Sequence, residues 1–268
     1  MAEAPERLSD EWTEDRLTRD AWLGGRLTLV QPRGGHRVGS DAALLTAAAD
    51  PAYGRVVDVG AGVGAVALAL IRRNERLAAD LIEIDPGLAR LAAANATRNG
   101  LAERVRILRI DIRAPRARHE AGLADDEAEA VVTNPPFFDY RAVRASSDGG
   151  KARAHVFPAG ETDGAPLIGW IRASLAILKP GGRFTMIHRP EALGAILEAA
   201  GNRIGAVALL PVFPHEGASA HRLLVSGIKG SRAPLRVASA LVLHQADGKL
   251  TGEADAIHRG EALLDWGV

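Results

Sequence analysis

Short apolar runs alternate with longer segments of helical period from residue 55 to about residue 228. This alternation predicts a parallel sheet covered by helices on both faces. The segment 214–220 is too short for a crossover, so the last two strands should form a hairpin in which one strand is antiparallel. The predicted fold class is α/β, with a seven-stranded, mostly parallel sheet. Strands are expected near 55–59, 79–84, 104–110, 128–133, 182–188, 204–212 and 221–228, and helices at 63–73, 86–99, 164–178 and 190–200.

The two ends of the chain carry weaker patterns than this core. The pattern of residues 1–20 predicts a frayed or loosely helical segment. A strand is expected at 27–31, followed by a helix that Asp41 caps and that runs to Ala49. The C-terminal segment predicts one strand, 236–243, and a final helix. We therefore expect an N-terminal extension at 1–54, a core domain at 55–230 and a C-terminal tail at 231–268, with both flanking segments packed on the core.

The composition narrows this picture mainly by exclusion. The chain has 268 residues with 33 basic and 33 acidic side chains, so any nucleic-acid site must be a local patch. It contains no cysteine, which excludes disulfides, thiol nucleophiles and thiolate metal sites. Because there is neither an apolar leader nor a long apolar run, we expect a soluble, cytoplasmic protein with no membrane partner.

The most informative stretch is 131–138, which reads Val-Val-Thr-Asn-Pro-Pro-Phe-Phe. Neither proline has an N–H, so a strand that reaches them must leave the sheet. At the carboxyl end of a parallel strand, where open α/β folds bind ligands, Asn134 offers an acceptor oxygen and Phe137 a flat apolar face. This combination suits a planar substrate with an exocyclic amino group. The alternative is an Asn-Pro turn that only ends the strand.

A glycine-rich segment with Gly60, Gly62 and Gly64 follows the first core strand and opens a helix. Glycines let a ligand approach the backbone, and the start of a helix supplies unpaired N–H groups. The spacing also fits the Gly-x-Gly-x-x-Ala pattern of dinucleotide oxidoreductases. Asp58, just before the glycines, would repel a pyrophosphate and favours a cationic ligand without phosphate.

Acidic residues also follow the second and third core strands. Glu83 is placed to accept hydrogen bonds from both hydroxyls of a ribose. Asp111 is placed to accept from an adenine amino group, although a turn-capping role is an equal alternative. Asp85 precedes Pro86 and is interpreted as a helix N-cap. Together with Asp58, Glu83 and Asp111 fit an adenosine that carries a positive charge.

Three further features complete the candidate chemistry. The loop 35–41 carries Arg37 and Asp41 among glycines and is either part of the ligand site or a helix-capping loop. The eight histidines include no pair at the spacing of helical metal ligands, so no metal is assigned. Residues 138–163 have no clear period and are interpreted as a long functional loop.

Together these motifs resemble those of the class I S-adenosylmethionine-dependent methyltransferases, which implies a Rossmann-like fold. The motifs are Asp-x-Gly-x-Gly-x-Gly at 58–64, Glu83, Asn-Pro-Pro-Phe at 134–137 and Lys-Pro-Gly-Gly at 179–182. The flanking segments 23–26, 31–45, 229–235 and 243–244 narrow the resemblance to the bacterial tRNA1(Val) (adenine-N6)-methyltransferases. Phe137 stands where that family commonly has Tyr, and His36 stands where an aromatic residue is usual.

The resemblance implies S-adenosylmethionine as cofactor, RNA as substrate with tRNA favoured, and methylation of an adenine N6. Asn134 and the Pro135 carbonyl would hold the amino group, and Phe137 would stack on the adenine. The cofactor would be bound by Asp58, Gly60, Gly62, Gly64, Glu83, Asp111, Arg37 and Asp41. The RNA would be held by Pro136, Phe138, Arg141, Arg144, Lys151 and Arg153.

Alternatives remain at this point. A glutamine-amide methyltransferase acting on a protein would use the same acceptors at Asn134 and Pro135, although the helical N-terminal domain usual in that family has little room before residue 55. A methyltransferase-like binding protein would keep the cofactor site without turnover. A dinucleotide oxidoreductase requires Asp58 to be incidental. The sequence makes no prediction of oligomeric state.

Overall fold

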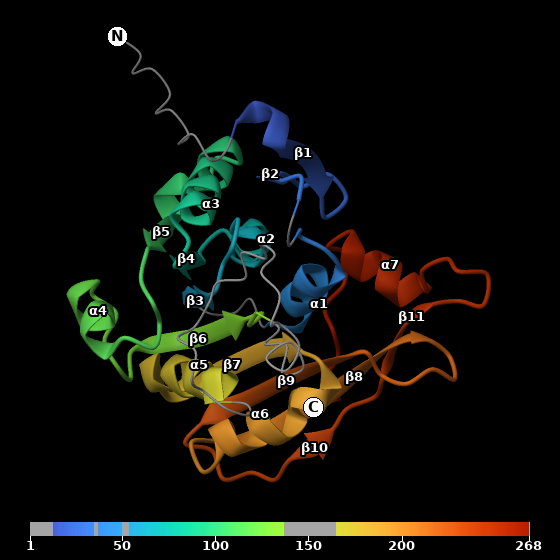
Figure 1. Ribbon diagram of the computed structural model, residues 1–268. Helices are drawn as coiled ribbons and strands as arrows, with labels where there is room; N and C mark the ends of the chain where they lie inside the picture. The colour runs from blue at the N-terminus through green and yellow to red at the C-terminus, as the bar shows by residue number, and fades with distance from the viewer. Residues whose placement is uncertain (1–12, 35–36, 50–53, 137–164, 268) are drawn as a thin grey trace, which may run out of the picture.

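The computed structural model describes residues 13–34, 37–49, 54–136 and 165–267, and a twisted central sheet runs through it (Figure 1). Its strands are β3 (Arg55–Val59), β4 (Ala78–Ile82), β5 (Val105–Leu108), β6 (Ala128–Thr133), β7 (Leu178–His188), β8 (Ile204–His215), β9 (Arg222–Lys229), β10 (Arg236–Val237) and β11 (Leu241–His244). Their order is β10-β8-β9-β7-β6-β3-β4-β5, with β11 also paired to β8. Only β9 runs antiparallel to its neighbours among these described strands. The predicted α/β class with one antiparallel strand is therefore confirmed, although the described sheet has nine strands where seven were predicted, because β10 and β11 both pair with β8.

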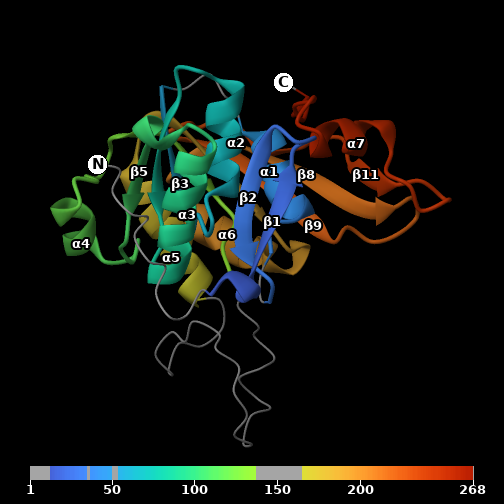
Figure 2. The same cartoon turned by 90° about the horizontal axis from the view of Figure 1, so that it is seen from above.

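Helices cover both faces of the sheet, as the alternating pattern predicted (Figures 1 and 2). One face carries α1 (Ser40–Ala48), α2 (Ala65–Arg73), α3 (Pro86–Arg98) and α7 (Gly252–His258). The other carries α4 (Pro115–Glu120), α5 (Ala165–Ile177) and α6 (Leu193–Ala200). Of these, α4 was not predicted, because a helix of six residues is too short to show a helical period.

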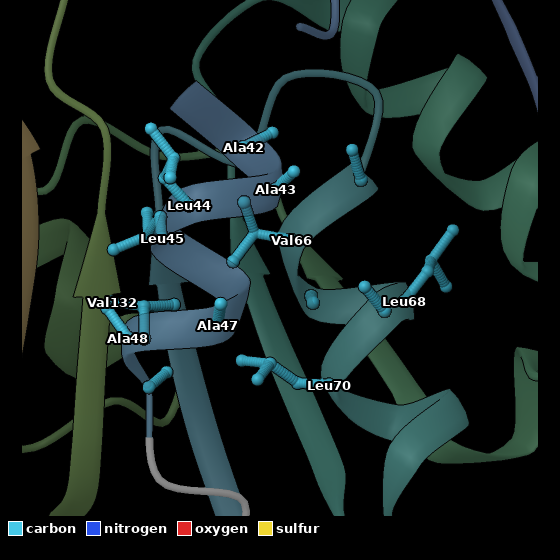
Figure 3. Close-up of a cluster of buried hydrophobic side chains, with 14 of the residues drawn as sticks. Ala42, Ala43, Leu44, Leu45, Ala47, Ala48, Val66, Leu68, Leu70 and Val132 are labelled. Carbon is cyan, nitrogen blue, oxygen red and sulfur yellow. The ribbon is translucent and has the colours of Figure 1, made fainter. Parts of the chain in front are cut away.

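The core on the first face forms around α1, whose side chains are apolar on almost every side (Figure 3). A helix with this pattern has to be buried all round. Leu44 and Leu45 are fully buried, and they belong to the same cluster as Leu68 and Leu70 of α2 and Val132 of β6. This packing fixes the start of α1 beside the carboxyl ends of the central strands.

The N-terminal segment forms a hairpin that includes the end of the predicted loosely helical segment 1–20, whereas residues 1–12 of that segment lie outside the described part of the chain. Strand β1 (Leu17–Trp22) pairs antiparallel with β2 (Leu27–Pro32) in a separate two-stranded sheet. Polar residues fill much of β1, so its strand character does not appear as an apolar run. The hairpin is joined to α3 through Asn95, whose Oδ1 accepts from the Val30 N–H (2.8 Å) and whose Nδ2 donates to the Val30 carbonyl (3.0 Å).

The predicted strand 236–243 is interrupted in the structure. The Ala238 N–H donates to the Leu209 carbonyl, so the backbone groups of Leu209 face this segment. Because backbone groups alternate in direction along a strand, every second residue after Leu209 faces the segment as well. Pro211, two residues further along β8, has no N–H to offer on that side. The segment therefore pairs as the two short strands β10 and β11, with a break between them.

Asp41 does not cap α1 as predicted. The helix begins at Ser40 after the N-cap Gly39, and Asp41 lies in its first turn. Both oxygens of Asp41 accept from Nε of Arg222, at 2.9 and 2.8 Å. At the other end of α1, the Leu264 N–H donates to the Ala47 carbonyl (2.9 Å) and Trp266 Nε1 donates to the Ala48 carbonyl (3.0 Å). The C-terminal segment is thus tied to the first helix.

Candidate active site

A cavity of about 490 Å³ lies at the carboxyl ends of β3 and β6, beside the start of α1 and the start of β9. Strands β3 and β6 are neighbours, and Val59 pairs with Thr133, so the segments that follow them emerge side by side. This is the edge at which parallel α/β sheets bind ligands. The cavity brings together six of the predicted site residues, namely Arg37, Asp41, Asp58, Gly60, Gly62 and Asn134.

Asn134 is held at this edge by the last residue of β6. Thr133 Oγ1 donates to the Val59 carbonyl (2.7 Å) and accepts from Nε1 of Trp170 (3.0 Å). The Oδ1 atom of Asn134 is buried and has no hydrogen-bond partner among the described residues. A buried acceptor without a partner costs about 1 to 3 kcal/mol, so it fits a ligand that brings an N–H donor. Pro135 is buried beside it, and Pro136 is exposed.

The three glycines of the loop after β3 have different structural roles. All have positive φ, at +75° for Gly60, +56° for Gly62 and +85° for Gly64. A Cβ on Gly60 would lie 2.9 Å from the Trp170 ring, whereas a Cβ on Gly62 would meet no atom within 4 Å. Gly64 does not line the cavity, and a Cβ there would lie 3.0 Å from Cδ2 of Leu81. Gly62 thus leaves open space for a ligand, while Gly60 and Gly64 permit close packing.

Asp58 is a buried acid in the wall of the cavity. Burial raises its pKa to about 7, although a hydrogen bond from the Ala67 N–H (3.1 Å) opposes the shift and the charge of Glu83 adds to it. A cationic group of a ligand would favour the ionised form.

Glu83 acts on the cavity through the backbone. Its Oε2 accepts from the Gly62 N–H (2.9 Å) and its Oε1 accepts from the Asp85 N–H (2.8 Å). Glu83 itself is not among the residues that line the cavity, so its contact with a ribose stays a prediction. Asp85 caps α3 as predicted, since its Oδ1 accepts from the N–H groups of Gly87 (2.7 Å) and Leu88 (2.8 Å).

Asp111 does not line the cavity and is engaged by Arg113. Its Oδ1 accepts from the Arg113 N–H (2.9 Å), and its Oδ2 pairs with Nη2 of the same residue (3.0 Å). Partial burial raises the pKa of Asp111, but the hydrogen bonds from Arg113 outweigh this and hold it below the usual value. The geometry agrees with the turn-capping alternative.

Sequence reasoning missed one wall of the cavity, formed by Arg222, His221 and His244. The His221 Nδ1 lies 3.1 Å from the Val212 carbonyl, and the His244 Nδ1 lies 2.9 Å from the Pro214 carbonyl. His188, at the end of β7, is buried near this wall, and burial lowers its pKa to about 4. His244 lies in the segment 243–244 that supports the resemblance, but no local pattern places any of these residues at the cavity, because strand pairing between distant segments brings them there.

Several predicted site residues lie outside the described part of the chain. They are Phe137, Phe138, Arg141, Arg144, Lys151 and Arg153, together with the predicted functional loop 138–163 and His36. Within the described ranges, no group of three or more His, Cys, Asp or Glu residues is arranged to hold a metal. No helix of the described structure has the length and apolar character needed to cross a membrane.

Comparison with known proteins points to methyltransferases. The profile of the methyltransferase small domain matches residues 36–148, which include the glycine-rich loop and Asn134. The chain is similar to this family over that segment. Its predicted Rossmann-like fold is confirmed by a solved structure described as a predicted O-methyltransferase from Agrobacterium tumefaciens, with a TM-score of 0.69 and 29% identity over 85% of this chain and 100% of that chain.

Curated relatives include three tRNA1(Val) (adenine(37)-N6)-methyltransferases. Identity is 28% for that of Trichodesmium erythraeum, over 62% of this chain and 66% of the relative. The enzyme of an Enterobacter species is 33% identical over 46% of this chain and 49% of the relative. That of Aeromonas hydrophila is 29% identical over 79% of this chain and 84% of the relative. The first two alignments thus span less than two thirds of the relatives. The predicted resemblance to this group is confirmed.

The similarity to methyltransferases supports S-adenosylmethionine as the cofactor, as predicted, and disfavours the oxidoreductase alternative. The described residues fit the cofactor. The acid Asp58 lies in the cavity wall with an elevated pKa, which suits a ligand with cationic ammonium and sulfonium groups. The open backbone at Gly62 leaves room for a ligand next to the loop.

Proposed function

We propose that this methyltransferase transfers the methyl group of S-adenosylmethionine to the N6 amino group of an adenine in RNA, with tRNA as the favoured substrate. The observation that carries the proposal is the buried, unpartnered Oδ1 of Asn134 in the wall of the cavity. An adenine N6 carries two N–H groups and can satisfy this acceptor. The names of the curated relatives support tRNA as the substrate class.

The cofactor supplies an electrophilic methyl group on a sulfonium, and the protein supplies position and oriented dipoles. Asn134 Oδ1 and the Pro135 carbonyl accept from the adenine amino group and hold its nitrogen lone pair toward the methyl. Both acceptors follow β6, whose end is fixed by the bond from Thr133 to Val59. Such preorganised acceptors become more valuable as positive charge develops on the nitrogen. No general base is needed before transfer.

Other predicted roles belong to the same proposal. Phe137 stacks on an adenine turned out of its RNA loop, while Arg141 and Arg144 contact phosphates with Lys151 and Arg153. Arg37 and Asp41, from the proposed extension 1–54, and His244, from the proposed tail 231–268, all line the cavity, which supports packing of both segments on the core. Since its substrate is tRNA, the enzyme works in the cytoplasm.

The test separates chemistry from folding at Asn134. Purified protein is incubated with labelled S-adenosylmethionine and, separately, with unfractionated tRNA, ribosomal RNA and total protein. We expect label in N6-methyladenine of tRNA. The Asn134→Ala variant should retain the melting temperature and cofactor affinity but lose ~10²–10³-fold in single-turnover rate, the typical cost of one oriented group.

Two companion variants sharpen this result. Asn134→Asp keeps an acceptor but adds charge near the sulfonium, so reduced yet measurable activity is expected. The exposed Asn202, in the turn before β8, provides a matched control, and Asn202→Ala should behave as the wild type. Near-normal rates with a lowered melting temperature in Asn134→Ala would assign Asn134 to turn capping instead. Label in protein glutamine, and not in RNA, would replace the RNA substrate with a protein.

A further inference from the structure

A second cavity, of about 600 Å³, lies between the β1–β2 hairpin and helix α3. Both views of the molecule show the hairpin beside α3 (Figures 1 and 2). The apolar part of its lining includes Leu17, Val30 and Leu91, which pack into a small cluster apart from the two main cores. Its polar rim carries Arg19, Arg33 and Arg98. The groove therefore combines an apolar floor with a basic edge.

The positive charge of this groove is not cancelled by its one lining acid. Asp20 accepts hydrogen bonds from Gln31 Nε2 (2.7 Å), Thr18 Oγ1 (2.7 Å) and Arg37 Nη2 (2.9 Å). These bonds, those from Gln31 and Thr18 foremost, hold its pKa below the usual value. By contrast, Arg33 and Arg98 are exposed and form no ion pair with another described residue. The charge of Arg33 also attracts Asp15 and helps to lower its pKa, but both guanidinium groups are exposed and accessible to an anionic partner.

The groove adjoins the candidate active site. Arg37 lines the active-site cavity, Asp20 lines the groove, and the two side chains form an ion pair of 2.9 Å. This ion pair therefore connects the wall of the active-site cavity to the wall of the groove. A polymeric ligand with one monomer in the active site can therefore place its neighbouring monomers over this ion pair and in the groove.

We propose that this groove binds the sugar-phosphate chain of the RNA substrate next to the target nucleotide. The inference rests on the proposed function, and it names a recognition site outside the loop 138–163. Phosphates lie against Arg33 and Arg98, while the apolar floor takes the face of a ribose or base. The chain as a whole carries 33 basic and 33 acidic residues, so attraction to a polyanion requires such a local concentration of arginine.

The test reverses the two exposed charges together. Fluorescence anisotropy with labelled unfractionated tRNA, over a series of salt concentrations, compares wild type with the Arg33→Glu, Arg98→Glu double variant. We expect roughly tenfold weaker binding and a salt slope reduced by about one to two units, since each lost phosphate contact removes nearly one. In methylation assays KM for tRNA should rise while kcat at saturation and calorimetric affinity for S-adenosylmethionine are retained.

A matched control uses Arg232, an exposed arginine just before β10, at the opposite end of the sheet from β5. Arg232→Glu should bind tRNA as tightly as the wild type does. If this control loses as much tRNA affinity as the double variant, net charge alone determines binding and the inference is overturned. If the double variant with two glutamates does not fold, the double variant Arg33→Gln, Arg98→Gln, which only removes the two charges, provides the same comparison.

Two outcomes separate this inference from the proposed function. If wild type methylates tRNA and the double variants keep its affinity and salt slope, the groove has no role in RNA binding and the inference is overturned. If wild type neither binds nor methylates tRNA, the RNA substrate itself is wrong. A groove that binds a polyglutamate peptide through Arg33 and Arg98, while tRNA binding is unchanged, would be a site for acidic protein segments and would also overturn the inference.

Discussion

Glu83 holds Gly62 in place through a hydrogen bond of 2.9 Å from the glycine N–H to its Oε2 atom. The second carboxylate oxygen accepts from the Asp85 N–H, so one side chain joins the glycine-rich loop to the start of α3. The loop borders the candidate active-site cavity, whereas Glu83 does not line it. The acid is therefore expected to affect cofactor binding through the position of the loop, in addition to its predicted contact with ribose.

The first prediction concerns this acid. Glu83→Ala should weaken S-adenosylmethionine binding by roughly 1.5 to 3 kcal/mol, the range for hydrogen bonds to a charged group. Isothermal calorimetry measures the change, and Glu103→Ala, at an exposed site in the turn before β5, is the control. Unchanged affinity in Glu83→Ala would remove Glu83 from the cofactor site.

The second prediction concerns the pH dependence of Asp58. Its pKa is about 7 in the folded protein, against 3.8 for the ordinary group, mainly because it is buried. The folded state thus binds more protons than the unfolded state between these values, and this group makes the ligand-free protein less stable as pH rises from about 4 to 7. Asp58→Asn should remove that component. Melting temperatures of both proteins across this range measure the difference, and identical profiles would contradict the assigned pKa.

Cofactor affinity should change with pH in the opposite direction. A cationic ligand favours the ionised form of Asp58, so S-adenosylmethionine should bind more tightly as pH rises through about 7. Calorimetry at pH 6 and pH 8, run on wild type and Asp58→Asn, provides the measurement. If both proteins gain affinity equally, the proton is bound elsewhere.

The third prediction concerns His188. Burial, with further lowering by the charges of Arg189 and Arg222, reduces its pKa from 6.5 to about 4, although the Arg189 backbone and the charge of Asp41 oppose the shift. The unfolded state therefore binds the extra proton between pH 6.5 and 4, and the protein should lose stability as pH falls through this window. A His188→Phe variant that folds should lose this acid-sensitive component. Chemical denaturation at pH 7 and pH 5 tests it, and an equal pH effect in both proteins would contradict the prediction.

The fourth prediction contrasts two glycines in one loop. Gly60→Ala should lower stability by several kcal/mol, because the new Cβ would lie 2.9 Å from the Trp170 ring at a φ of +75°. Gly62→Ala meets no atom within 4 Å, so only backbone strain of roughly 1 kcal/mol applies, together with weaker cofactor binding. Thermal unfolding ranks the two variants, and equal destabilisation would show that the loop rearranges.

The sequence predicted the central strands well because they are buried on both faces. For β6, a mostly apolar segment is followed closely by two prolines that cannot continue a ladder, and both of its bounds were predicted correctly. The hairpin strand β1 escaped prediction because polar residues occupy its positions 18–20 and only Leu17 is buried. The break between β10 and β11 depends on Pro211 in a different strand, which no local pattern can reveal.

The same distinction holds for the candidate site. Asn134 and Gly62 follow strand ends and Asp58 is the penultimate residue of β3, and in a parallel sheet those ends meet at one edge. Arg222 begins the antiparallel strand, and His244 ends a strand from the C-terminal segment. Their positions at the cavity follow from strand pairing between segments far apart in the chain. Sequence motifs therefore predicted the loops after the parallel strands, but not the wall that faces them.

The hydrogen bonds between α1 and the C-terminal segment connect parts of the chain that are far apart in sequence. The start of α1, with Asp41, lines the active-site cavity, and the indole that binds the Ala48 carbonyl at the other end of the helix belongs to Trp266, 218 residues later. The Ala47 carbonyl likewise accepts from the Leu264 N–H. A truncation before Leu264 would therefore leave both carbonyls without these donors and remove part of the support of the helix that lines the cavity.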